Sequence, residues 1–143
     1  MSKTPPQSFE GSCLCGAVRY RADAPFKLFQ YCHCSRCQKA TGSALAANLF
    51  VDSGQFAWLS GEDRLKRYRL PDAKHFGTVF CSDCGGNLPW QTADGATTVI
   101  PAGGLDQSPP DRPVQSIHWG SHADWYLEPG ALPKHDQLPP RKG

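Results

Sequence analysis

Residues 81–86 read Cys81-Ser82-Asp83-Cys84-Gly85-Gly86, and the strongest prediction about the fold comes from this segment. Two cysteines in a CxxC spacing followed by glycines are typical of a zinc knuckle. In that turn both thiolates reach one metal ion, and the glycines let the backbone approach without Cβ clashes. Upstream, Cys13-Leu14-Cys15 supplies a second pair, which can chelate because alternate residues of an extended or bulged chain share a face. The two pairs together offer the four sulfurs that a closed tetrahedral structural zinc requires: Cys13, Cys15, Cys81 and Cys84.

A third group of thiols lies between these pairs, in Cys32-His33-Cys34-Ser35-Arg36-Cys37. Cys34 and Cys37 have the spacing of residues on one helical face, and Cys32 joins them from the end of a predicted strand. Three protein ligands leave one zinc position for water or substrate, which distinguishes catalytic from structural sites. A zinc of this kind suits a substrate thiol such as that of glutathione, whose pKa it would lower.

His33 admits three interpretations. It can be a fourth ligand that closes the second site, an exposed polar residue, or a proton shuttle near the open position. A residue flanked by two ligands is expected to point away from the metal that they share, because side chains alternate along an extended chain. A redox role for the CxxC motifs is the further alternative, but the βαβ context of thioredoxin-like chemistry is not predicted here.

Length and composition narrow the class of protein. The chain has 143 residues, about one domain, and its 15 Lys+Arg nearly balance its 13 Asp+Glu, so no general attraction to nucleic acid or acidic membrane is expected. The sequence lacks the run of roughly 20 apolar residues that spans a bilayer, and the apolar segment of a secretory signal. We therefore expect a cytoplasmic protein, in which disulfides rarely persist. Seven cysteines leave one over in any all-disulfide scheme, whereas a four-plus-three division leaves none.

The rest of the chain predicts a mainly β domain of short antiparallel strands with one short helix. The helix is predicted over 35–40, with Ser35 as its N-cap and Gly42 in the left-handed position after its last turn. We expect a single folded unit over 10–127, with Pro-rich or polar loose tails at 1–9 and 128–143. Strands rich in β-branched and aromatic residues and bounded by turn residues are predicted at 16–21, 27–31, 44–51, 56–59, 65–70, 78–80, 88–91, 97–100 and 116–119.

Several of these segments resemble the family of glutathione-dependent formaldehyde-activating enzymes, which also includes centromere protein V. The resemblance rests on residues 11–20, 32–43 and 80–85 and extends to Ile117-His118-Trp119 and Asp124-Trp125. It implies a β-tent fold of small antiparallel sheets held together by zinc. It also implies that Cys13, Cys15, Cys81 and Cys84 form the structural site and that Cys32, Cys34 and Cys37 form the catalytic site. The activity implied is a carbon-sulfur lyase reaction that joins glutathione to formaldehyde, giving S-(hydroxymethyl)glutathione.

Three functions are therefore compared. The first is a zinc-dependent carbon-sulfur lyase with two zinc sites, acting on glutathione adducts or another small thiol or aldehyde. The second is a non-catalytic zinc module that carries glutathione or docks a protein partner, with a fourth protein ligand such as His33 closing the second site. The third, a nucleic-acid-binding zinc module, is disfavoured by the near-neutral charge. No membrane or nucleic-acid partner and no particular oligomeric state are predicted.

Other residues are candidates for substrate contacts. Glutathione carries carboxylates, and the basic residues that could contact them are Arg19, Arg36, Lys39 and Arg67. An aromatic and imidazole cluster in the last folded segment can line a pocket or close the core, and aromatics are common in small cores. Its members are His118, Trp119, His122, Trp125 and Tyr126.

Overall fold

A computed structural model describes residues 7–141, which form three small sheets and one α-helix. The prediction of a mainly β chain with small sheets and one helix is confirmed. The first sheet has the order β1 (Ser8–Ser12), β2 (Arg19–Asp23), β5 (Phe56–Ser60). The second has the order β11 (Ser116–Ile117), β3 (Leu28–Cys32), β4 (Ala46–Asp52), β10 (Thr97–Pro101), β9 (Trp90–Gln91), and the third β6 (Leu65–Arg69), β7 (Gly77–Cys81), β8 (Asn87–Leu88).

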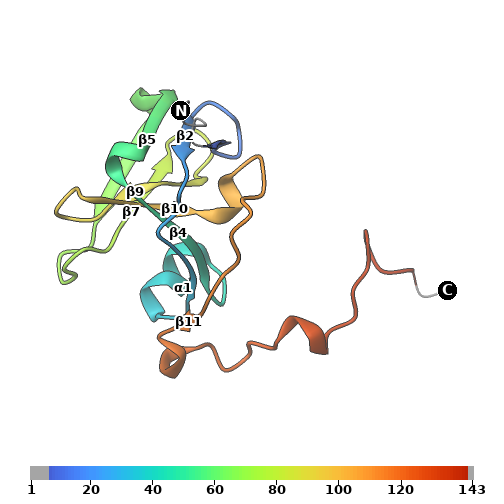
Figure 1. Cartoon of the computed structure of the whole chain (residues 1–143). Coiled ribbons are helices and arrows are strands. Elements are labelled where there is room, and N and C mark those ends of the chain that lie inside the picture. Colours follow the sequence, from blue (N-terminus) through green and yellow to red (C-terminus); the bar gives the residue numbers. More distant parts are fainter. Residues whose placement is uncertain (1–6, 142–143) are drawn as a thin grey trace, which may run out of the picture.

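All strand pairs within these sheets are antiparallel except β11 with β3, which is parallel. In Figure 1, β2 and β5 lie at one end of the body, while α1 and β11 lie at the other, with β4 and β10 between them. The short 3-10 helices are η1 (Ser53–Gln55), η2 (Glu62–Arg64), η3 (Ala102–Gly104), η4 (Trp119–Ser121) and η5 (Pro129–Ala131).

The main core lies where the sheets meet. On β2, Tyr20 and Ala22 are fully buried while Arg21 between them is exposed, which is the alternation expected of a strand with one inward face. Leu49 of β4 pairs with Ile100 of β10, and both are fully buried. Cys13 and Cys81 belong to this same core cluster. The four-cysteine site therefore adjoins the hydrophobic core through these two residues, while Cys15 is exposed.

Three of the strand predictions need correction. β1 was missed, because Phe9 is a single apolar residue among polar ones and gives no alternating pattern. The structure shows it buried and packed 5.5 Å from the ring of Phe26. The predicted strand over 88–91 is two strands, β8 and β9, which belong to different sheets on either side of Pro89. The strand predicted over 116–119 ends at Ile117, because His118 adopts a left-handed φ of 54° and η4 follows.

The helix α1 covers Ser35–Thr41, close to its predicted range, but its N-cap is Cys34 and not Ser35. The sulfur of Cys34 accepts a hydrogen bond from the backbone N–H of Cys37 at 3.4 Å, which satisfies a donor of the first turn. Gly42 takes the left-handed C-terminal position as predicted, with φ 68°, and its N–H donates to the Gln38 carbonyl. Among residues 7–141 no helix has the length and apolar character needed to cross a membrane.

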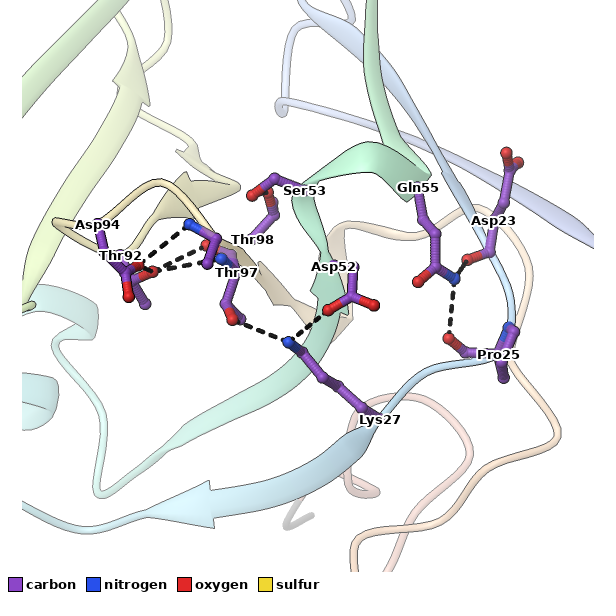
Figure 2. A network of polar contacts seen from close by, with 11 residues as sticks. Asp23, Pro25, Lys27, Asp52, Ser53, Gln55, Thr92, Asp94, Thr97 and Thr98 are labelled. Carbon is purple, nitrogen blue, oxygen red and sulfur yellow. Dashed lines mark hydrogen bonds and ion pairs between the residues drawn. The ribbon is translucent and has the colours of Figure 1, made fainter.

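Polar contacts join the first and second sheets where the chain passes from β4 through η1 into β5 (Figure 2). Lys27 donates to Asp52 at 2.7 Å and to Thr97 at 2.9 Å. These bonds connect the start of β3 to the last residue of β4 and the first residue of β10. Gln55 donates its side-chain N–H groups to the carbonyls of Asp23 and Pro25. These contacts fix the loop between β2 and β3, and so the direction in which β3 carries Cys32.

The predicted tails are only partly described. Residues 1–6 and 142–143 lie outside the described residues, and β1 begins two residues before the predicted boundary of the folded unit. From residue 127 to residue 141 every side chain is exposed, and this segment runs away from the sheets in Figure 1.

Candidate metal centres

The four cysteines predicted for a structural site lie together. All four Sγ atoms are within 4.8 Å of one another, with 3.7 Å between those of Cys13 and Cys15 and 3.9 Å between those of Cys15 and Cys81. A tetrahedral zinc with Zn–S bonds of about 2.3 Å places its sulfurs about 3.8 Å apart. The cluster therefore has the donor atoms and the spacing of a closed zinc site.

Backbone groups support these sulfurs. The N–H of Val18 donates to the Cys13 sulfur at 3.3 Å, and the N–H of Gly86 donates to the Cys84 sulfur at 3.4 Å. Hydrogen bonds from the backbone of Cys15 and of Gly86 lower the pKa of Cys84 to about 6. A Cβ atom at Gly86 would lie 3.0 Å from the Leu14 nitrogen and 3.4 Å from the Cys84 sulfur. The turn after Cys84 is therefore shaped for thiolates and for a close approach of backbone.

The three cysteines of the second group also lie together, with their Sγ atoms within 4.8 Å of one another. Cys32 ends β3, Cys34 caps α1 and Cys37 lies in the first turn, so the strand-to-helix junction itself gathers the sulfurs. Cys32 and Cys37 are buried and Cys34 is half-buried. The sequence prediction of this grouping rests on local spacing, and the geometry allows these sulfurs to hold a metal ion.

The electrostatics of the three-cysteine cluster favour a negative charge on Cys32. A hydrogen bond from the thiol of Cys37 lowers the pKa of Cys32 to about 5, and the charge of His118 acts in the same direction. The same pairing, together with burial, raises the pKa of Cys37. The two opposite shifts correspond to one thiolate and one thiol, and a bound cation would favour the thiolate form of the ligands.

His33 lies apart from the three sulfurs and does not join their cluster among the described residues. Its ring is fully buried against the ring edges of Trp119, at 4.9 Å between centroids, and Tyr126, at 5.2 Å. The interpretation of His33 as an exposed residue is therefore wrong. Neither ring nitrogen has a hydrogen-bond partner within residues 7–141. Side-chain alternation between two ligands explains why the ring points away from the cluster.

The predicted aromatic and imidazole cluster assembles in part. Trp119 and His122 stack with 4.1 Å between ring centroids, and Tyr126 packs on Trp119. His118 is exposed, and Trp125 is 69% exposed. Gln38 of α1 ties this segment to the cluster of cysteines, since its amide donates to the carbonyls of His33 at 2.8 Å and Ser121 at 3.0 Å.

The candidate basic residues do not converge on one point. Arg19 of the first sheet pairs with Asp106 at 2.9 Å, and residues 36 and 39 lie on the exposed side of α1. Arg67 of β6 lines a cavity of about 390 Å³ between β5, β6 and β9, together with Trp58 and Trp90. The structure therefore does not assemble a glutathione clamp from this set.

A cavity that no sequence pattern indicates lies beside Cys37. It has a volume of about 150 Å³ and is bounded by α1, β4, the third sheet and η3. Its walls come from segments that are far apart in the chain, so no local pattern could indicate it. The cavity places open space next to one of the three clustered thiols.

The fold and sites define a class of small β protein with two thiol clusters. One has four sulfurs at the edge of the core, the other has three at a strand-to-helix junction, and each could hold a metal ion. Residues 8–121 match the family described as glutathione-dependent formaldehyde-activating enzyme. The chain belongs to this family, as the resemblance predicted.

Two known proteins are similar to this chain, one in sequence and one in fold. A protein of Halomonas elongata, whose name assigns it provisionally to the glutathione-dependent formaldehyde-activating enzymes, is 32% identical over 118 residues, which cover 76% of this chain and 72% of the relative. A Rhodobacter sphaeroides protein of known crystal structure is similar in fold, with a TM-score of 0.58 and 22% identity, over 75% of this chain and 98% of that protein.

Proposed function

We propose that this protein is a zinc-dependent enzyme that forms or cleaves the carbon-sulfur bond between a small thiol, glutathione or a related one, and an aldehyde. The observation that carries the proposal is the three-cysteine cluster. It offers three sulfurs, no fourth protein ligand approaches them among the described residues, and a cavity adjoins Cys37. Membership of a family named for glutathione and formaldehyde supports this reaction class.

Each part of the site has a role in the proposal. Cys32, Cys34 and Cys37 would hold the zinc, which when bound supplies a position for the substrate thiol and stabilises its thiolate. The N–H of Cys37 hydrogen-bonds to the Cys34 sulfur and orients that ligand. Trp119 and Tyr126 pack against the neighbouring His33 ring. The side-chain amide of Gln38 in α1 donates to the backbone carbonyls of His33 and Ser121, which joins this segment to the helix. These contacts therefore fix the strand-to-helix junction that carries the three ligands.

The four-cysteine cluster would hold a second, structural zinc in the same proposal. Its sulfurs come from two segments of the chain, and Cys15 and Cys81 are 66 positions apart. The distances between the sulfurs are those of a closed tetrahedral site. Two zinc ions per chain follow, and a reducing compartment such as the cytoplasm would keep all seven thiols available. In the non-catalytic alternative a fourth protein ligand such as His33 closes the second site, and the position of the His33 ring against Trp119 weighs against His33 in that role.

The test is a rate measurement on the zinc-loaded protein. Glutathione and formaldehyde also combine without an enzyme, so magnetisation-exchange NMR with ¹³C-formaldehyde should compare the exchange rate with that of the buffer alone. We expect acceleration by the wild type, loss of acceleration in Cys34→Ser, and retention in Ser35→Ala, which changes the adjacent exposed residue. Rates equal to the buffer rates for the zinc-loaded wild type, with formaldehyde and with benzaldehyde alike, would refute the proposed function.

A further inference from the structure

The cavity beside Cys37 has the character of a binding pocket for an uncharged, apolar group. None of its lining residues is acidic or basic, and most are apolar, including Ala40 of α1, Leu45, Phe76 and Leu88. The polar side chains of the wall carry no charge, so carboxylates and ammonium groups would lose their hydration without gaining an oppositely charged partner. These polar side chains are Thr41, Asn48, Thr78 and Asn87. The wall favours hydrocarbon, which gains free energy on leaving water.

The volume of the cavity limits the size of that group. An apolar cavity of about 150 Å³ engineered in another protein binds a benzene molecule, and one water occupies about 30 Å³ in the liquid. The volume of about 150 Å³ here is therefore right for a ring or branched chain of about six carbons. Formaldehyde, with one carbon, would leave most of it empty, and glutathione would bring two carboxylates against apolar walls.

From these observations we propose that the cavity is a subsite for the carbon substituent of an aldehyde larger than formaldehyde, about the size of a phenyl group. The inference rests on the proposed function, because Cys37 is both a wall of the cavity and a member of the three-cysteine cluster. The thiol partner would approach from outside the cavity. The substituent would fix the carbonyl carbon beside the cluster, which orients it for attack.

The reaction balances without an added oxidant or reductant. The sulfur of the thiol R–SH forms a bond to the carbonyl carbon of R′–CHO, and the π bond of that carbonyl breaks. The electron pair moves to the oxygen, which takes up the proton that the thiol released. The product is the hemithioacetal R–S–CH(OH)–R′, in which R′ occupies the cavity, and the reverse reaction returns the thiol and the aldehyde.

The first experiment tests the cavity alone, without metal chemistry. Benzene is titrated into ¹⁵N-labelled, zinc-loaded protein, and NMR shift changes are followed for the wild type, Ala40→Leu and Ala131→Leu. Ala40 lines the cavity, whereas Ala131 is exposed in the C-terminal segment and serves as the matched control. We expect saturable benzene binding to the wild type and to Ala131→Leu, and at least tenfold weaker binding to Ala40→Leu. Failure of the wild type to bind benzene overturns the proposal.

The second experiment tests the link to the reaction. The ratio of the benzaldehyde rate to the formaldehyde rate with glutathione is measured above the buffer rate for the same three proteins. We expect this ratio to fall at least tenfold in Ala40→Leu and to stay unchanged in Ala131→Leu. If Ala40→Leu does not fold, Leu45→Phe fills the same space and replaces it.

The outcomes separate the subsite from the proposed function. Acceleration with formaldehyde alone, or a benzaldehyde-to-formaldehyde ratio that Ala40→Leu leaves unchanged, overturns the subsite and leaves the proposed function standing. Absence of acceleration with both aldehydes overturns both. Tighter benzene binding in the wild type together with a lower rate ratio in Ala40→Leu supports the subsite.

Discussion

The two cysteine clusters should differ sharply in their effect on stability, and paired substitutions can show this. Cys81 has no exposed surface and lies within the main core cluster, whereas Cys34 is half-buried and packs only against the small group of Cys32, Cys37 and Ala46. Cys81→Ser would remove one of four sulfurs from the core site. Cys34→Ser would remove one of three sulfurs from the other site.

The magnitudes follow from the roles of the two residues. Structural zinc binding contributes about 10–16 kcal/mol in small zinc domains, and the whole stability of a domain is about 5–15 kcal/mol. Losing even half of the zinc term at Cys81 would therefore leave no stable fold. At Cys34 the serine also favours the N-cap position that Cys34 occupies, so the helix keeps its cap. We expect Cys34→Ser to lose about 1 kcal/mol, or about 3–5 °C in Tm for a chain of this size.

The assay combines zinc content by elemental analysis with thermal unfolding by circular dichroism, on protein kept reduced. We expect two zinc ions per chain in the wild type, one in Cys34→Ser with a cooperative transition, and no cooperative transition in Cys81→Ser. Ser82→Ala changes the exposed neighbour of Cys81 and should behave as wild type. Equal losses of Tm in both cysteine variants would refute the division into a structural and a catalytic site.

Three further results are expected. A chelator should remove zinc from the three-cysteine site before the core site, and added glutathione should slow this first loss. A zinc-sensitive dye follows the release, and equal release rates for both ions would contradict the expected order. Tyr20→Phe should raise stability by about 1 kcal/mol, because the buried Tyr20 hydroxyl has no hydrogen-bond partner within residues 7–141, and a lower Tm would show that a partner exists. Gly86→Ala should cost about 1–3 kcal/mol by crowding Leu14 and Cys84. Gly54→Ala, where a Cβ meets nothing within 4 Å, is its control in the same melting assay.

The grouping of the cysteines could be predicted because it depends on short spacings. Cys81 and Cys84 are joined by one turn, and Cys34 and Cys37 by one turn of helix, so the local backbone brings each pair together. The partnership of Cys15 with Cys81 spans 66 residues and was predicted from the count of ligands, not from the chain path. Coordination chemistry thus supplied a long-range contact that secondary-structure patterns do not contain.

Other features could not be predicted because they depend on tertiary packing. Phe9 makes β1 part of the core only through its contact with Phe26, and a single apolar residue gives no periodic signal. Pro89 separates two strands of different sheets, although 88–91 was predicted as one strand. The burial of His33 depends on Trp119, which lies more than 80 residues away in the chain. The walls of the cavity beside Cys37 come from α1, β4, β7, β8 and η3, which lie far apart in the chain.

If both clusters bind zinc as proposed, the lengths of chain that they close give the two sites different weights in stability. A cross-link that closes a loop of 66 residues, as between Cys15 and Cys81, restricts the unfolded chain by about 4 kcal/mol in the loop-entropy account. The three-cysteine cluster lies within residues 32–37, and a loop of that size yields only about 2 kcal/mol. The second metal would thus add less to stability and can be exposed to substrate exchange at lower risk to the fold. The local cluster also lies inside the loop that the core cluster closes, so the core site positions the strand-to-helix junction before a metal is bound there.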